Sequence, residues 1–156
     1  MLNVPMDILK VHPIRKTKVQ KEAFRADVLA LAKEMGATAI INFKELKTIE
    51  ERVAKVQELT GGFGADFVFQ CTGVPQAAAD AYKYVRRGGG YCEMGFFVNA
   101  GECTMNPHFD LCNKEITLVG SWVYSANEYI ETLGFLKNAR AMGIPVEKLV
   151  TDHYPL

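Results

Sequence analysis

Apolar residues alternate along this chain between the spacing of helices and that of strands. In residues 21–36 they recur every three or four positions, which predicts a helix, and Gly36 follows as a left-handed C-cap. The helix-spaced apolar residues are Phe24, Val28, Leu31 and Met35. The apolar run 37–43 then predicts a buried strand, so the pattern begins with a helix that leads into a strand.

A capping box marks the next helix. Thr48 and Glu51 stand three positions apart, the spacing at which each side chain bonds to the backbone N–H of the other residue, and they predict a helix over 48–59. The apolar stripe that should pack on the sheet is Ile49, Val53 and Val56. The apolar run 66–71 predicts the next strand.

Glycines lie on both sides of that strand, in the stretch ELTGGFGADFVFQCTG. Gly61, Gly62 and Gly64 precede it, whereas the glycines of a dinucleotide phosphate loop follow a strand and open a helix. They therefore predict a tight helix-to-strand connection with positive φ angles. Residues 71–74 leave the strand and enter a helix near Pro75, which puts them at the carboxyl end of a parallel strand, where open α/β sheets bind ligands.

The same alternation continues to the C-terminus, where Ser125 and Glu128 repeat the capping box. After residue 74 we expect a helix over 75–85 with Ala78, Tyr82 and Val85 on one face, a turn over 86–90 and a strand over 91–95. A loop over 96–105, a short helix over 107–115 and a strand over 116–124 should follow. The last elements expected are a helix that ends at Gly143, with Tyr129, Leu133 and Leu136 inward, and a strand over 146–156. Such alternation indicates an α/β fold with a mainly parallel sheet and helices on both faces.

The chain length and charge limit the classes of function. The 156 residues suit one domain, and the 18 basic and 18 acidic side chains balance, which argues against nucleic-acid or membrane partners. The first residues show no secretion signal, so a cytoplasmic location is expected. Residues 1–20 form a basic leader of uncertain structure, and the domain occupies 21–156.

Cysteine and histidine residues give no sign of a metal site. None of the four cysteines forms a C-x-x-C pair, and the three histidines are scattered, so no zinc is expected. They are Cys71, Cys92, Cys103, Cys112, His12, His108 and His153. His108 is expected to have a surface or packing role, and no residue is predicted to be catalytic.

Five strings, in this order and spacing, resemble the zinc-dependent medium-chain alcohol dehydrogenases, a group that includes the sorbitol and threonine dehydrogenases. The strings are LAKEMGATAIINF, ELTGGFGADFVFQCTG, YVRRGGGYCEMG, NKEITLVGSW and KLVTDHYPL. The resemblance covers residues 29–156 and implies that 21–156 is a fragment of a Rossmann-like domain that binds NAD or NADP. It also implies a homodimer, because 116–124 resembles the edge strand that pairs with its copy in that family.

The resemblance carries over three cofactor-binding segments. Residues 71–74 resemble those that line the adenosine and ribose, 94–96 those beside the nicotinamide ring, and 121–123 those that meet the carboxamide. The candidate residues are Cys71, Thr72, Gly73, Val74, Met94, Gly95, Phe96, Ser121, Trp122 and Val123. In the family these are mainly backbone contacts, which tolerate varied side chains.

Two functions remain open. The first is an alcohol dehydrogenase-like oxidoreductase fragment that is not catalytically competent alone, because residues 1–27 contain no glycine where the family has its G-x-G-x-x-G turn. A Rossmann site without that turn lacks the N–H groups that hold the pyrophosphate. The alternative is a non-catalytic α/β module for binding or oligomerisation. In either case we expect an uncovered sheet edge, which residues 11–19 of the leader are suited to cover, since Val11, Ile14 and Val19 favour strands.

Overall fold

The structure is a computed structural model that describes residues 27–150, 152 and 155. The leader 1–20, the start of the first predicted helix and most of the chain end beyond 150 lie outside these described residues. None of the helices in the described part is long and apolar enough to cross a bilayer.

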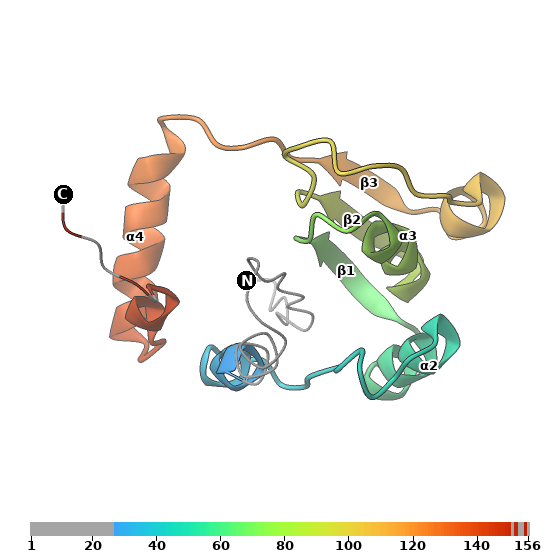
Figure 1. Ribbon diagram of the computed structural model, residues 1–156, viewed down its shortest axis with the longest axis horizontal. Coiled ribbons are helices and arrows are strands. Elements are labelled where there is room, and N and C mark those ends of the chain that lie inside the picture. The colour runs from blue at the N-terminus through green and yellow to red at the C-terminus, as the bar shows by residue number, and fades with distance from the viewer. Residues whose placement is uncertain (1–26, 151, 153–154, 156) are drawn as a thin grey trace.

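A parallel sheet of three strands forms the centre of the molecule, in the order β1-β2-β3 (Figure 1). Strand β1 is Ala65–Gln70, β2 is Val85–Glu93 and β3 is Thr117–Gly120. Val68 of β1 pairs with Tyr91 of β2, which in turn pairs with Leu118 of β3. The predicted α/β fold with a parallel sheet and helices, like the Rossmann-type domain, is thus confirmed.

Helix α3, Pro75–Tyr84, connects β1 to β2 and packs on one face of the sheet. Pro75 stands at its first position as predicted, and the helix runs directly into β2. Its Tyr82 ring stacks on the fully buried Tyr91 of β2 at a centroid distance of 4.3 Å. The buried core around this stack is Val56, Val68, Ala81, Tyr82, Tyr84, Val85 and Tyr91.

Helix α2, Ile49–Leu59, begins with the predicted capping box: the Glu51 N–H donates to Thr48 Oγ1 at 3.2 Å, and the Thr48 N–H donates to Glu51 Oε2 at 2.9 Å. An ion pair between two largely buried side chains then ties α2 to α3, with Arg52 Nη2 2.7 Å from Asp80 Oδ2. Arg52 also donates from Nε to the Tyr84 hydroxyl at 3.0 Å, so its guanidinium fixes how the two helices pack.

The glycine turn between α2 and β1 has the predicted conformation. Gly61, Gly62 and Gly64 have φ angles of 64°, 91° and 97°. A Cβ at Gly64 would lie 3.0 Å from the Tyr84 carbonyl oxygen, so the turn also needs glycine for space.

Residues 37–43 are not the strand that the sequence predicts. The helix before them covers 27–34, and Gly36 closes it at a φ of 104°, as expected. A strand needs a neighbour for its backbone groups, however, and β2 is the only partner of β1 within the described part of the chain. Apolar composition alone therefore does not make 37–43 a strand.

The glycine run 86–90 is also not the predicted turn. It lies inside β2, where the register shifts: Ala65 pairs with Val85, but Phe67 pairs with Gly90. The extra residues of β2 form an irregularity of the bulge type, and a Cβ at Gly90 would collide with the Phe67 ring. The glycines thus permit a bulge and a close approach.

The C-terminal third differs most from the sequence expectations. Strand β3 covers only Thr117–Gly120 of the predicted 116–124, and Val123 adopts a left-handed φ of 54°. The short helix expected at 107–115 is present as the π-helix η1, Pro107–Cys112. A 3₁₀ helix, η2, Val146–Leu149, stands where the last strand was expected to begin.

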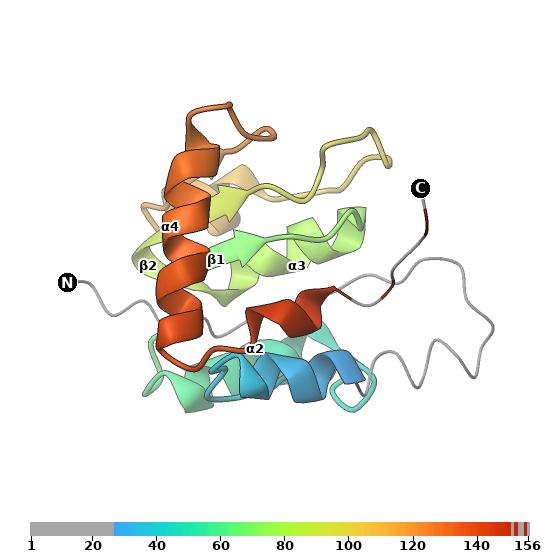
Figure 2. The ribbon, with the colours of Figure 1, turned by 90° about the vertical axis from the view of Figure 1, so that its left-hand side faces the viewer.

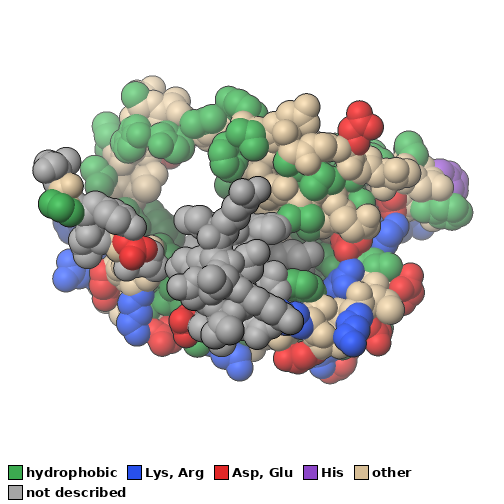
Figure 3. All heavy atoms as spheres, in the orientation of Figure 1, with side chains coloured by type: hydrophobic (Ala, Val, Ile, Leu, Met, Phe, Trp, Pro, Cys, Tyr) green, Lys and Arg blue, Asp and Glu red, His purple; other side chains and the backbone are tan. Residues whose placement is uncertain are grey.

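Helix α4, Glu128–Ala141, lies beyond the carboxyl ends of the strands (Figures 1 and 2). Of the predicted capping box one half is present, a 2.5 Å bond from the Ser125 N–H to Glu128 Oε2. Of the three residues predicted to point inward, Tyr129 and Leu133 are more than half exposed, so the prediction is wrong for them, whereas Leu136 is half-buried. The buried residue of α4 is Ala139. Hydrophobic side chains of α4 and of residues 121–124 are exposed, and such side chains gather on this part of the surface (Figure 3).

Candidate functional site

Three strand ends meet at the carboxyl edge of the sheet, and each leads into one of the predicted cofactor-binding segments. Because the strands are parallel, 71–74, 94–96 and 121–123 all start from this edge. The Met94 N–H donates to the Gln70 carbonyl at 3.1 Å, and the Ser121 N–H donates to the Glu93 carbonyl at 2.9 Å. The structure therefore brings the starts of these segments together; whether they bind a cofactor remains a prediction.

The side chain of Glu93 connects the ends of β1 and β2. Its carboxylate accepts a bond from the Tyr91 hydroxyl at 2.8 Å, one from the Gly95 N–H at 2.9 Å and one from Gln70 Nε2 at 3.2 Å. Bonds to a charged acceptor are stronger than neutral ones, so this carboxylate is the central acceptor of the edge.

Gln70 extends this network to the segment after β1. Its Nε2 donates to the Thr72 carbonyl at 2.7 Å, and its Oε1 accepts the Thr72 N–H at 2.5 Å. The side chain is almost completely buried, and both of its polar atoms have partners. Gln70 thus fixes the first turn of 71–74 while Glu93 fixes that of 94–96.

Tyr91 links this network to the hydrophobic core. Burial, followed by its hydrogen bond to Glu93, raises the pKa of Tyr91 far above its ordinary value of about 10. The hydroxyl therefore remains protonated and remains a donor to Glu93 at any physiological pH.

Gly95 is the point of closest approach between two of the segments. A Cβ there would collide with the Thr72 carbonyl oxygen and would lie 2.6 Å from the Thr72 nitrogen. These obstacles are backbone atoms, which cannot rotate away, so only glycine allows 94–96 to pass this close to 71–74.

The candidate residues differ in how they face solvent. Thr72 is buried, and its Oγ1 has no hydrogen-bond partner among the described residues. The exposed candidates, which a ligand can reach, are Cys71, Gly73, Met94, Ser121, Trp122 and Val123. Val74 and Phe96 are half-buried and Gly95 is buried. Although Cys71 is exposed, partial desolvation by the surrounding atoms, followed by interactions with Cys92 and Glu93, raises its pKa, so its sulfur is a neutral thiol and not an activated nucleophile.

The described part of this edge suits a nucleoside better than a diphosphate. The N-terminus of α3 lies here, but its N-cap Val74 makes no side-chain cap, and Pro75 has no N–H. The N–H groups of Ala77 and Ala78 both donate to the Val74 carbonyl, at 2.9 and 3.2 Å. The glycine turn that presents free N–H groups to a pyrophosphate has no counterpart in residues 27–150.

Zinc does not fit the described residues, because they contain no group of three or more His, Cys, Asp or Glu side chains placed to hold a metal ion. His108 lies on η1 with its ring edge-on to Phe109 at 4.8 Å. We therefore derive no chemical step through zinc.

Gln70, Tyr91 and Glu93 are not among the site residues predicted from the sequence. All three lie inside strands that were expected to be structural only. A signal was present in the sequence: Gln70 and Glu93 are polar residues at the ends of apolar strands, and each stands two positions from the residue whose backbone it fixes. Their register as direct partners could not be deduced without the structure.

Comparison with known proteins gives consistent results. The sequence profile of the zinc-binding dehydrogenases matches residues 23–138. The sorbitol dehydrogenase of Bacillus subtilis (strain 168) is 37% identical over 129 residues, which is 82% of this chain and 33% of that protein. The D-arabitol-phosphate dehydrogenase of Enterococcus avium is 30% identical over 141 residues, which is 90% of this chain and 36% of that protein.

Solved structures show the same similarity. The crystal structure of an alcohol dehydrogenase from Thermotoga maritima matches with a TM-score of 0.71 at 30% identity, over 80% of this chain and 33% of that one. The benzyl alcohol dehydrogenase of Acinetobacter calcoaceticus matches with a TM-score of 0.65 at 25% identity, over 81% of this chain and 33% of that one. This chain spans about a third of the length of the curated relatives it matches.

Replacing Gly95 tests the close packing of the site. We expect Gly95→Ala to lower the free energy of unfolding by about 1–3 kcal/mol, because the added methyl group has to displace backbone. Urea denaturation followed by circular dichroism measures this change.

Gly120→Ala is the matched control. A Cβ at Gly120, the last residue of β3, has nothing within 4 Å. We expect a change within about 0.5 kcal/mol. Equal losses in the two variants would contradict the packing that we describe.

Proposed function

Since this chain belongs to the zinc-binding dehydrogenase family, we propose that it forms one side of a binding site for NAD or NADP. The single observation that supports this most strongly is the Glu93 network, which fixes the first residues of two strand-end segments at the edge where α/β sheets bind nucleotides. The ligand is a nucleotide, and the surface it contacts is largely backbone.

Within this proposal the three segments have separate roles. Residues 71–74 line the adenosine and its ribose, 94–96 pass the nicotinamide ring, and the backbone of 121–123 meets the carboxamide. The exposed Trp122, at 71% of its full area, offers a large aromatic surface beside the last of these. The hydrogen bonds from the backbone N–H groups of Thr72 and Gly95 hold the first two segments in place before the ligand binds.

We assign no catalytic residue. Alcohol oxidation requires a group that stabilises the alkoxide while hydride leaves, and the described residues supply neither a zinc ligand set nor another cation at this edge. We propose that the chain alone binds a nucleotide without turning over an alcohol, and that it works in the cytoplasm.

A titration that compares ligands of different length tests this proposal. We expect adenosine, AMP, NAD⁺ and NADP⁺ each to raise the melting temperature saturably, because a ligand that binds only the native state stabilises it. We expect NAD⁺ to bind more tightly than AMP by much less than a hundredfold, since its nicotinamide adds contacts to 94–96 and 121–123 while its diphosphate finds no free N–H turn among the described residues. Differential scanning fluorimetry at constant ionic strength measures the shifts.

The Gly95→Ala and Gly120→Ala pair localises the binding. The first variant should lose affinity for adenosine and the second should keep it. If NAD⁺ bound a hundredfold more tightly than AMP, this would contradict our proposal that the described residues contain no binding site for the diphosphate. The absence of any shift at millimolar ligand would favour the non-catalytic module.

Strand β3 supports a second role, the assembly of a homodimer. All four of its residues are exposed, and its outer edge has no neighbour within the described residues. Leu118 and Val119 stand about half exposed along it. An apolar edge strand of this kind is suited to pairing with a second copy.

A charge on the edge strand should abolish this pairing. We expect Val119→Lys to be monomeric by light scattering coupled to size exclusion, because lysine at an edge disfavours strand pairing. Leu149→Lys places the same charge on η2, at a side chain that is also about half exposed, and should leave the dimer intact. A wild-type chain that is monomeric at all concentrations would contradict the dimer.

A further inference from the structure

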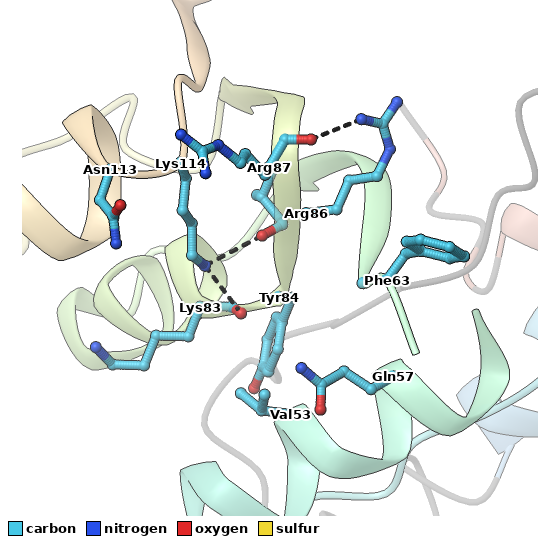
Figure 4. Close-up of a pocket in the computed structure, with 11 residues that line it drawn as sticks. Val53, Gln57, Phe63, Lys83, Tyr84, Arg86, Arg87, Asn113 and Lys114 are labelled. Carbon is cyan, nitrogen blue, oxygen red and sulfur yellow. Dashed lines mark hydrogen bonds between the residues drawn. The ribbon is translucent and has the colours of Figure 1, made fainter. Parts of the chain in front are cut away.

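A cleft lies at the opposite end of the strands from the nucleotide edge (Figure 4). It measures about 240 Å³ and lies between α2, the glycine turn before β1, the start of β2 and residues 113–114. The first residues of β2 line it, whereas the nucleotide edge follows the last ones. The two sites therefore share a strand but no lining residue.

The charged side chains that line this cleft are all basic, although one of them, Lys83, forms an ion pair with Asp110 at 3.2 Å. Of the described residues that line it, four are cationic and none is acidic. The cationic residues are Lys83, Arg86, Arg87 and Lys114.

Lys114 contributes a charge that has no carboxylate bonded to it. Its Nζ donates to the carbonyl oxygens of Tyr82 at 2.9 Å, Lys83 at 3.3 Å and Val85 at 3.1 Å, where α3 ends. Burial lowers the pKa of Lys114; Asp110 opposes this effect and the nearby charge of Lys83 adds to it. An anion in the cleft would relieve this unfavourable environment.

The two arginines keep donors free for a ligand. Arg87 Nε lies 3.3 Å from Glu115 Oε2, and both side chains are about 70% exposed, so water weakens this pair. Arg86 bonds to Asp66 through Nε and to the Arg87 carbonyl through Nη1. The two terminal nitrogens of Arg87 make no hydrogen bond to the described residues, and such a fork suits the oxygens of a phosphate.

We propose that this cleft binds the phosphate group of a small phosphorylated organic molecule. The Arg87 fork donates to the phosphate oxygens, and Lys114 and Arg86 add charge. Val53 and the exposed Phe63 ring stand across the cleft, where they offer an apolar wall to the organic part (Figure 4). This site is independent of the proposed nucleotide site.

Titration with inorganic phosphate and with phenyl phosphate tests the proposal. The chemical shifts of the backbone amides of 83–87 and 113–114 should change saturably at constant ionic strength, with phenyl phosphate tighter because its ring contacts Phe63. Chloride at the same ionic strength should have no saturable effect. Equal responses to chloride and phosphate would overturn the site, since they would indicate general screening.

Three variants make the test specific. Arg87→Gln should weaken phosphate binding about tenfold, the loss expected for one charged hydrogen bond. Glu115→Gln should strengthen it, because it frees the Arg87 guanidinium from its acidic partner. Lys137→Gln removes an exposed cation from α4, outside the cleft, and should have no effect.

A structural role for these cations gives a different result. If they only stabilise the end of α3, Glu115→Gln would not tighten phosphate binding and Arg87→Gln would weaken it no more than Lys137→Gln, which would overturn the proposal. Failure of the nucleotide site is separable, because Gly95→Ala should lose adenosine and retain phenyl phosphate.

Discussion

The conformation of the carboxyl edge of this sheet depends on the hydrogen bonds that three donors make to the carboxylate of Glu93. The donors are the hydroxyl of Tyr91, the amide of Gln70 and the backbone N–H of Gly95. Each comes from a different part of the structure: the core, the neighbouring strand and the segment that leaves β2. Since bonds to a charged acceptor are strong, one side chain fixes the first residues of the segment after β2 and the Gln70 side chain at the end of β1.

Tyr91 connects the hydrophobic core to the carboxyl edge of the sheet. Its ring stacks on Tyr82 of α3 while its hydroxyl serves Glu93, so the packing of α3 on the sheet determines where the acceptor lies. Strand β2 consequently differs in character between its ends. At the start of β2, Arg86 and Arg87 line the basic cleft. At its end, the carboxylate of Glu93 is held by hydrogen-bond donors. A single strand thereby supports two surfaces of different chemistry.

Sequence patterns predicted correctly those features that depend only on residues close to one another in the chain. The capping box of Thr48 and the positive φ angles of the glycine turn follow from short-range hydrogen bonds and sterics, and both are present. Two features whose cause lies elsewhere in the fold were predicted wrongly, the strand at 37–43 and the inward face of α4. Residues 37–43 need a neighbouring strand to pair with, and α4 needs a surface to pack against. The sequence of each segment does not show whether the rest of the fold supplies that partner. The Glu93 network is of this second kind, because only the pairing of β1 with β2 brings Gln70 beside it.

Residue-resolved hydrogen exchange in the wild type and in Glu93→Ala tests most directly whether this carboxylate holds the edge. We predict that the amide of Gly95, which loses its acceptor, and that of Thr72, whose acceptor Gln70 loses its bond to Glu93, exchange at least about tenfold faster in the variant. The amides of Ser121, which donates to the retained main-chain carbonyl of residue 93, and of the buried Val68 should change little. Unchanged exchange at Gly95 would contradict the account.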